Sequence, residues 1–321
     1  MNAPRVSVLV PVFNGDRFLA ECLDSVLAQD FEDLEVLLSD DGSTDDSGAL
    51  IQRYARLDRR IRWWRNPRNL GIGGNFNACL TQARGRYMKY VLQDDKLLSA
   101  WAVRRMVEVL EADPSVSLVV SAALLIDEHS RAIRERYCFK ESGPWDGKEV
   151  ILHCLEQNAN KIGEPSLGMF RREQAGAGYD VRFKQLLDLD FWFSLLEQGR
   201  FFNIAEPLCA FRQHPAQLSE VNRRTGASAG EDLLLVEKCY GRPWFRQLVA
   251  TDSATRWKLC QQLYYLRKDH GPDAPLAAAI SGSIGPRTYF SWWVWHRLSR
   301  PVFNLIRHLE KRRRPSGPWD R

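Results

Sequence analysis

The chain has 321 residues, of which 45% are hydrophobic and 26% are charged. These proportions are those of a folded globular protein, so a mostly disordered chain is excluded, and the length suits one large domain with an extension. The formal net charge of +5 is too small for a typical nucleic-acid-binding protein, and we expect no nucleic-acid partner.

The seven cysteines are scattered and form no Cys-x-x-Cys pair, so we expect reduced thiols and no zinc site. The apolar run Val6 to Val12 is too short for a signal peptide and ends in a turn. No segment has the roughly 20 consecutive apolar residues that a membrane-spanning helix needs. We therefore expect a cytoplasmic protein that contacts a membrane only at its surface.

The first part of the chain alternates between strands and helices. Short β-branched, apolar segments predict buried strands, which are Val6–Val12, Leu34–Ser39, Ile61–Arg65 and Tyr87–Leu92. Segments with apolar residues at helical spacing predict the helices between them, which are Asp16–Gln29, Ser47–Leu57 and Asn75–Arg84. This alternation is typical of a parallel sheet covered by helices, so the predicted fold class is α/β.

The alternation becomes less regular after Asp95. The elements expected there are the helix Trp101–Ala112, the strand Val116–Ile126, the helices Lys148–Asn158 and Phe183–Gln198, and the short strand Phe201–Ile204. Loops are expected at Gly143–Gly147 and Arg212–Pro215, and the pattern is helical from Gly226 onward.

Polar residues follow four of the predicted strands, namely Asn14, Asp40-Asp41, Asn69 to Gly71, and Asp94-Asp95. Ligands of parallel sheets bind outside the carboxyl ends of the strands, so these residues should converge at one edge. The carboxylates of Asp40 and Asp41 could accept hydrogen bonds from a nucleobase or ribose, although Asp-Asp-Gly-Ser is also ordinary turn chemistry.

Two further acidic groups predict catalysis and metal binding. Asp94 and Asp95 repel each other unless a cation offsets them, and Mg²⁺ or Mn²⁺ is typically held by one or two carboxylates plus substrate phosphates. Asp188 and Asp190 stand among large apolar residues, which raise a carboxylate's pKa and suit it to act as general base. The alternative for Asp94 and Asp95 is a solvated turn. The alternative for Asp188 and Asp190 is a pair that caps the N-terminus of a helix. His214 is a candidate third metal ligand or phosphate contact.

In this order and spacing, the motifs resemble those of family 2 glycosyltransferases with the GT-A fold. The motifs are Pro11-Val12-Phe13-Asn14, Asp40-Asp41-Gly42-Ser43-Thr44-Asp45, Asn69-Leu70-Gly71, Gln93-Asp94-Asp95 and the Phe-Trp helix with Asp188 and Asp190. The similarity runs from about Val6 to about His214. It implies a Rossmann-like, mostly parallel sheet flanked by helices, with a helical C-terminal extension outside the similarity.

The resemblance also implies roles for individual residues. The nucleotide would be held by Pro11, Phe13, Asn14, Asp40, Asp41, Asn69, Gly71 and Asp94. The metal would be held by Asp94 or Asp95, with His214 completing the site. Asp188 matches the usual base, with Asp190 as the alternative, and transfer would be a single displacement with inversion at the anomeric carbon.

The chain departs from the family pattern at three places. Gln93 or Leu92 stands where many relatives have an Asp before the metal-binding carboxylate, which leaves Asp94 and Asp95 both open. Phe76 replaces an Arg that contacts the donor, and Leu187 replaces the acidic residue that precedes the base.

The end of the chain is aromatic and then basic. Trp292, Trp293 and Trp295 precede a cluster of Arg and Lys at 311–314, a composition that favours binding to an anionic membrane surface. The alternative is a helix packed on the catalytic domain. The expected organisation is a transferase domain over residues 1–225, with nucleotide binding in about 1–100 and acceptor binding and catalysis in about 101–225, and a helical region over 226–321.

We therefore expect an inverting glycosyltransferase that uses Mg²⁺ or Mn²⁺ and a nucleotide-sugar donor, UDP- or dTDP-linked, with a saccharide or lipid-linked saccharide as acceptor. The resemblance favours bacterial surface polysaccharide assembly at the inner membrane. One alternative is a nucleotidyltransferase, which would need a Gly-rich basic loop where this chain has Pro11 to Asp16. Another is a non-catalytic scaffold, which would not need the acidic pairs.

Overall fold

A computed structural model describes residues 3–228, 230–257, 259–260, 264 and 284–294. The chain forms two compact units, one made of Met1–Ile151 and Asn160–Ala229 and the other of Leu152–Ala159 and Gly230–Arg321. The first unit holds the sheet and all the predicted site residues. In the second, the regular structure of the described residues is helical. The expected division at residues 225 and 226 into functional domains stays a prediction.

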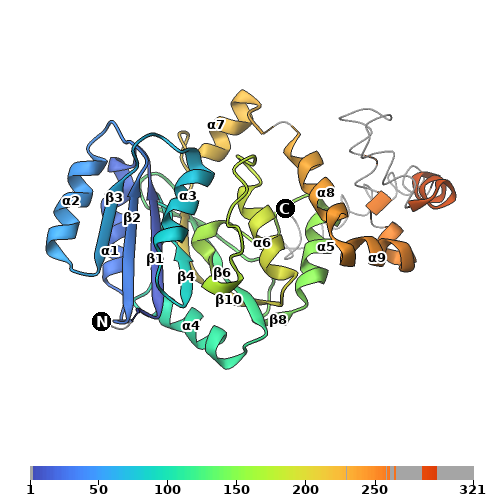
Figure 1. The fold of residues 1–321 in the computed structure, drawn as a ribbon, viewed down its shortest axis with the longest axis horizontal. Coiled ribbons are helices and arrows are strands. Elements are labelled where there is room, and N and C mark those ends of the chain that lie inside the picture. Colours follow the sequence, from blue (N-terminus) through green and yellow to red (C-terminus); the bar gives the residue numbers. More distant parts are fainter. Residues whose placement is uncertain (1–2, 229, 258, 261–263, 265–283, 295–321) are drawn as a thin grey trace. The chain divides into compact units, whose positions relative to one another are not determined.

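A ten-stranded sheet organises the first unit. Its strands are β1 (Val6–Val12), β2 (Leu34–Asp40), β3 (Ile61–Arg65), β4 (Tyr87–Tyr90), β5 (Lys96–Leu97), β6 (Val116–Ile126), β7 (Ala132–Arg136), β8 (Gly143–Trp145), β9 (Gly168–Arg171) and β10 (Arg200–Arg212). The strand order is β3-β2-β1-β4-β9-β6-β10-β5, with β7 paired to β6 and β8 paired to β10. Figure 1 shows β3, β2, β1 and β4 side by side in this order.

The strands from β3 to β4 run parallel, and Val8 of β1 faces Val36 of β2 on one side and Lys89 of β4 on the other. The antiparallel strand β9 joins β4 to β6, and β6 is parallel to β10. The predicted α/β class with a largely parallel sheet is therefore confirmed. The carboxyl ends of β1, β2 and β4 lie at one edge, because the three strands are adjacent and parallel.

Helices connect and cover the strands. They are α1 (Asp16–Leu27), α2 (Ser47–Leu57), α3 (Gly71–Gln82), α4 (Ala102–Ala112), α5 (Gly147–Gln157), α6 (Leu187–Leu196), α7 (Leu218–Thr225), α8 (Glu231–Gly241) and α9 (Pro243–Thr251), with short 3₁₀ turns at Pro165–Leu167 and Arg172–Gln174. The apolar stripe of α1 is buried as its spacing predicts, at Phe18, Leu19, Cys22, Leu23 and Val26. Within the described ranges, no helix is long and apolar enough to cross a membrane.

Three predicted boundaries differ from the structure by more than two residues, and the loop expected at Gly143–Gly147 contains β8. The short strand expected at Phe201–Ile204 extends to Arg212, because β10 pairs with β6 along its length and absorbs Pro207 between two register shifts. The helix expected from Phe183 begins only at Leu187. The helix expected from Asn75 begins earlier, at Gly71.

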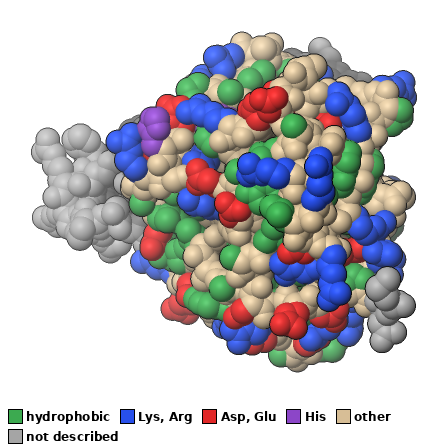
Figure 2. All heavy atoms as spheres, turned by 90° about the vertical axis from the view of Figure 1, so that its left-hand side faces the viewer, with side chains coloured by type: hydrophobic (Ala, Val, Ile, Leu, Met, Phe, Trp, Pro, Cys, Tyr) green, Lys and Arg blue, Asp and Glu red, His purple; other side chains and the backbone are tan. Residues whose placement is uncertain are grey.

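Charges are interspersed on the face over α2 and β3, where Figure 2 shows acidic side chains among basic ones. The Arg60–Asp58 pair, 2.7 Å apart, belongs to this part of the chain. The basic cluster at 311–314 lies outside the described residues. Of the aromatic residues before it, Trp292 is buried and Phe290 is 64% exposed. Membrane binding through this region stays a prediction.

Candidate active site

The segment that follows β1 is locked to the segment that follows β2. Asn14 has a left-handed backbone, with φ of 49°. Its N–H donates to Ser43 Oγ at 3.0 Å, and its side-chain oxygen accepts from the N–H of Thr44 at 2.8 Å. Phe13 leaves 46% of its surface exposed beside this junction. Pro11, Phe13 and Asn14 thus lie at the carboxyl edge, as expected of residues that line a ligand pocket.

Asp40 and Asp41 are both buried at the end of β2, with 1% and 2% of their surface exposed. Asp41 Oδ1 accepts hydrogen bonds from Asn66 Nδ2 at 2.8 Å and from the N–H of Leu70 at 2.9 Å. This carboxylate therefore fixes the loop that enters α3. Asp40 Oδ2 has no hydrogen-bond partner among the described residues, although Arg65 lies 3.6 Å away. A buried oxygen without a donor is a natural acceptor for a ligand N–H or hydroxyl.

Asn69 and Gly71 form the turn before α3. Asn69 donates to the carbonyl of Asp41 at 3.1 Å and accepts from the N–H of Gly71 at 2.9 Å. Gly71 has φ of 73°, which is costly for a residue with a side chain, and a Cβ there would meet no atom within 4 Å. The backbone at Gly71 therefore borders open space at the carboxyl edge of the sheet.

Gln93 ties the end of β4 to the end of β1. Its Oε1 accepts from the N–H of Phe13 at 2.8 Å, and its Nε2 donates to the carbonyl of Phe13 at 2.9 Å. A Cβ on Gly15 would fall 2.3 Å from Gln93 Oε1, so the glycine makes room for this amide. The residue that departs from the family's acidic pattern thus has a structural role that the sequence did not indicate.

Asp94 and His214 meet at this edge although 120 residues separate them. Asp94 Oδ2 and His214 Nε2 lie 3.0 Å apart, and the Asp94 side chain is 24% exposed. Asp95, in contrast, is 1% exposed, and its Oδ1 accepts from the main-chain N–H of Arg212 at 3.0 Å. Burial, and next the Asp94 charge, raise the pKa of Asp95 well above its usual range.

The three predicted metal ligands are therefore not brought together, because the Asp95 carboxylate is buried and accepts a hydrogen bond from the main chain of Arg212. In the part of the chain that the structure describes, no group of three His, Cys, Asp or Glu side chains could hold a metal ion. Asp94 and His214 remain as a pair. One carboxylate oxygen and one imidazole nitrogen fit a Mg²⁺ or Mn²⁺ ion whose other ligands are diphosphate oxygens and water.

Asp188 lies in the first turn of α6, half-buried. Its Oδ2 accepts from Asn160 Nδ2 at 2.9 Å and its Oδ1 from the N–H of Leu189 at 2.8 Å. Burial, and next the charge of Glu164, raise its pKa to about 7. Asp190 is 2% exposed. Of the two predicted bases, Asp188 is therefore the more accessible to an acceptor.

Glu164 connects the two acidic groups. After burial, its charge contributes to the raised pKa of both Asp95 and Asp188. Arg136 pairs with both of its carboxylate oxygens, one of them at 2.8 Å. The sequence indicated no role for Glu164 in catalysis. No local pattern pairs it with Arg136, because β7 and the loop before the 3₁₀ turn Pro165–Leu167 meet only in the fold.

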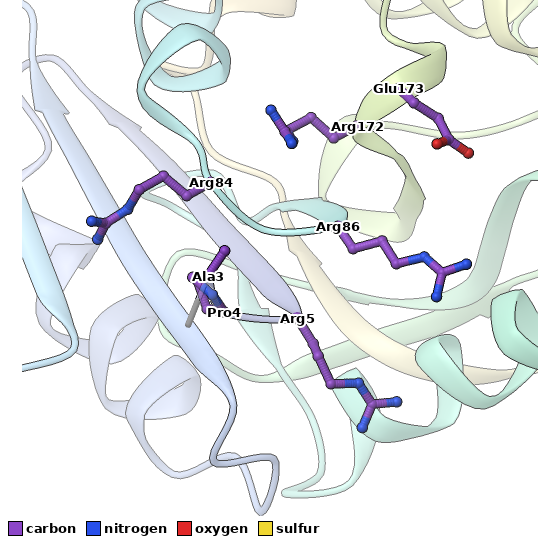
Figure 3. A pocket seen from close by; sticks show the side chains of 7 residues that line it. All are labelled: Ala3, Pro4, Arg5, Arg84, Arg86, Arg172 and Glu173. Carbon is purple, nitrogen blue, oxygen red and sulfur yellow. The ribbon is translucent and has the colours of Figure 1, made fainter. Parts of the chain in front are cut away.

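A separate hollow of about 280 Å³ lies at the amino end of the sheet, lined by Ala3, Pro4, Arg5, Arg84, Arg86, Arg172 and Glu173. Figure 3 shows that its guanidinium groups do not converge, because Arg84 and Arg172 point one way and Arg5 and Arg86 another. Arg5 and Arg84 also pair with the carboxylates of other residues. The convergent polar groups lie at the carboxyl edge instead.

A largely parallel sheet with polar and acidic groups at its carboxyl edge is the arrangement in which α/β proteins bind a ligand at that edge. The glycosyl transferase family 2 model matches residues 7–174, just over half of the chain. The chain therefore belongs to glycosyl transferase family 2.

Two relatives illustrate the range of this similarity. An uncharacterized protein of Mycobacterium tuberculosis, MT1568, is 31% identical over 228 residues, which cover 66% of this chain and 68% of the relative. The GalNAc(5)-diNAcBac-PP-undecaprenol beta-1,3-glucosyltransferase of Campylobacter jejuni is 40% identical over 97 residues, which cover 30% of this chain and 31% of the relative.

Solved structures share the fold. S. aureus TarS 1-349 in complex with UDP-GlcNAc has a TM-score of 0.63 and 16% identity, and the match covers 82% of this chain and 73% of TarS. The mannosyltransferase PcManGT of Pyrobaculum calidifontis, in complex with GDP-Man and Mn²⁺, has a TM-score of 0.53 and 19% identity, covering 95% and 88%. The predicted GT-A fold is confirmed, and the protein is a glycosyltransferase.

Proposed function

We propose that the protein transfers a sugar, with inversion, from a UDP- or dTDP-sugar to an acceptor hydroxyl. The contact between Asp94 and His214 at the carboxyl edge carries the proposal, since it offers a metal-binding pair beside the buried carboxylates of Asp40 and Asp41. The UDP-GlcNAc complex of TarS supports a uridine nucleotide, although PcManGT binds GDP-Man.

Asp188 is the proposed general base. The acceptor hydroxyl attacks the anomeric carbon, its proton passes to the Asp188 carboxylate, and the bond to the nucleoside diphosphate breaks on the opposite face. A pKa of about 7 lets the carboxylate be ionised near neutral pH and still bind the proton. The hydrogen bond from Asn160 to one carboxylate oxygen fixes the orientation of the Asp188 side chain.

Asp94 and His214 are the residues that would hold Mg²⁺ or Mn²⁺. The metal, when bound, neutralises the charge that develops on the leaving diphosphate. Phe13 and Asn14, with Asn69 and Gly71, would line the nucleotide pocket, and Asp40 would accept a hydrogen bond from the base or ribose.

The acceptor we propose is a lipid-linked saccharide of bacterial surface polysaccharide, met at the cytoplasmic face of the inner membrane. The name of the Campylobacter relative, which acts on an undecaprenol-linked glycan, supports this class.

A thermal-shift panel of UDP, dTDP, GDP and CMP, each with Mn²⁺, Mg²⁺ or EDTA, tests the proposal. Ligand at about a hundred times its Kd stabilises the fold by roughly 2.7 kcal/mol. We expect a shift with UDP or dTDP that becomes smaller in EDTA. A shift with GDP alone would overturn the donor assignment, and no shift with any nucleotide would favour a non-catalytic scaffold.

A further inference from the structure

A buried guanidinium lies directly behind the Asp94–His214 pair. The Arg212 side chain is fully buried, at 0% exposure, and its cation stacks on the Phe18 ring with 4.4 Å to the centroid. The same Phe18 ring contacts the His214 ring, with 5.0 Å between centroids. A buried cation needs full hydrogen bonding and a counter-charge, and the partners that Arg212 finds define what it does.

Arg212 joins the two chain segments that carry the pair. Its Nε donates to the main-chain carbonyl of Asp94 at 2.8 Å, and its own N–H donates to Asp95 at 3.0 Å. His214 follows two residues later, just beyond the end of β10. Arg212 therefore fixes the distance between the Asp94 carboxylate and the His214 imidazole.

Glu21 of α1 supplies the counter-charge. Its Oε2 accepts from Arg212 Nη2 at 3.1 Å, Ser130 Oγ at 2.6 Å and Lys96 Nζ at 2.9 Å. Burial opposes ionisation, yet the hydrogen bonds and the Arg212 charge lower the pKa of Glu21 to about 2. An unbalanced guanidinium so close to a divalent cation would repel it, and Glu21 removes that repulsion.

We propose that Arg212 and Glu21 are positioning residues, through which α1 and β10 hold Asp94 and His214 in metal-binding geometry. The inference rests on the proposed metal site. Outer partners of metal ligands typically contribute about 10–100-fold to metal affinity. Glu21 reaches Asp94 through Arg212, which is hydrogen-bonded to both residues, so the effects of Glu21 and Arg212 on metal affinity should be strongly coupled.

The test compares Glu21→Gln, Arg212→Gln and the double variant with Asp30→Asn, which breaks the exposed Arg104–Asp30 pair instead. The Kd for Mn²⁺ is measured by electron paramagnetic resonance in the presence of UDP, and the Kd for UDP is measured in EDTA. We expect Mn²⁺ to bind about tenfold more weakly to each single variant. The double variant should match Arg212→Gln, with UDP affinity in EDTA and the Asp30→Asn control unchanged.

Glu21 is the more tolerant position, because its side chain is 45% exposed, so Glu21→Gln decides the matter if Arg212→Gln does not fold. Unchanged Mn²⁺ affinity in Glu21→Gln would overturn the inference, as would tighter binding in Arg212→Gln or additive losses in the double variant. An equal loss of metal-free UDP affinity would also overturn it, by indicating general damage. If the unsubstituted chain binds no Mn²⁺ with UDP, the proposed metal site itself is wrong.

Discussion

At the scale of residues, the environment divides the acidic side chains into different tasks. Asp41 accepts a hydrogen bond that fixes the loop before α3, and Asp95 accepts one from the main chain of Arg212. Asp94 and Asp188 remain partly accessible. The sequence predicted Asp41, Asp94 and Asp95 at one edge, because each follows a predicted strand, whereas Asp188 was expected within a helix. It could not separate Asp94 from Asp95, because that choice depends on the main-chain N–H of a residue 117 positions away.

The base assignment predicts the effect of two substitutions. Asp188→Asn should lower kcat by at least about a hundredfold, since the amide cannot take the acceptor's proton, while Kd for UDP stays unchanged. Asp190→Asn should retain more activity per folded molecule, because Asp190 is buried. Steady-state kinetics with titration of UDP checks both, and a rapid Asp188→Asn enzyme would refute the assignment.

The pKa of Asp188, about 7, predicts a pH dependence. The ionised carboxylate is the active form, so kcat should fall as the pH drops through 7 and level off above it. Glu164→Gln removes a negative charge that raises this pKa, so the acidic limb should move to lower pH. Glu173→Gln, at the opposite edge, serves as the control. A limb that stays in place or moves upward would contradict the role of Glu164.

At the scale of elements, local patterns predicted the long strands and helices well. The segments Ser47–Leu57, Ile61–Arg65 and Val116–Ile126 have the predicted bounds, because each has a sustained apolar period. The short strands β5, β7, β8 and β9 were not predicted. β5, β8 and β9 pair with strands far away in the sequence, such as Phe170 of β9 with Met88 on one side and Leu118 on the other, whereas β7 forms a hairpin with β6.

Gly85, between α3 and β4, has a role that only packing explains. A Cβ at this position would lie 2.5 Å from the main-chain nitrogen of Ser7 and 2.7 Å from the carbonyl carbon of Val6. Gly85→Ala should therefore destabilise the fold by about 1–3 kcal/mol through overpacking against β1. Gly241→Ala, where a Cβ meets nothing within 4 Å, should not lower the melting temperature. Equal melting temperatures for the two variants would contradict this account.

At the scale of the whole molecule, the proposed lipid-linked acceptor requires contact with a membrane. Replacing Lys311, Arg312, Arg313 and Arg314 by Gln should abolish flotation with anionic liposomes, because each basic residue contributes about 1 kcal/mol of attraction. Neutral liposomes provide the control. If the substituted chain floats as well as the original, the basic cluster does not attach the protein to the membrane.

The antiparallel strand β9 divides the sheet into two blocks. The block from β3 to β4 carries Asn14, Asp40 and Asp94, whereas β10 beyond β9 leads to His214. Among the residues that the structure describes, the four residues Gly168–Arg171 of β9 join the two blocks within the sheet. We therefore expect the first block to set the nucleotide preference, because it carries Asn14 and Asp40. Chimaeras between relatives should accordingly keep the donor of the parent that supplies the first block and adopt a new acceptor.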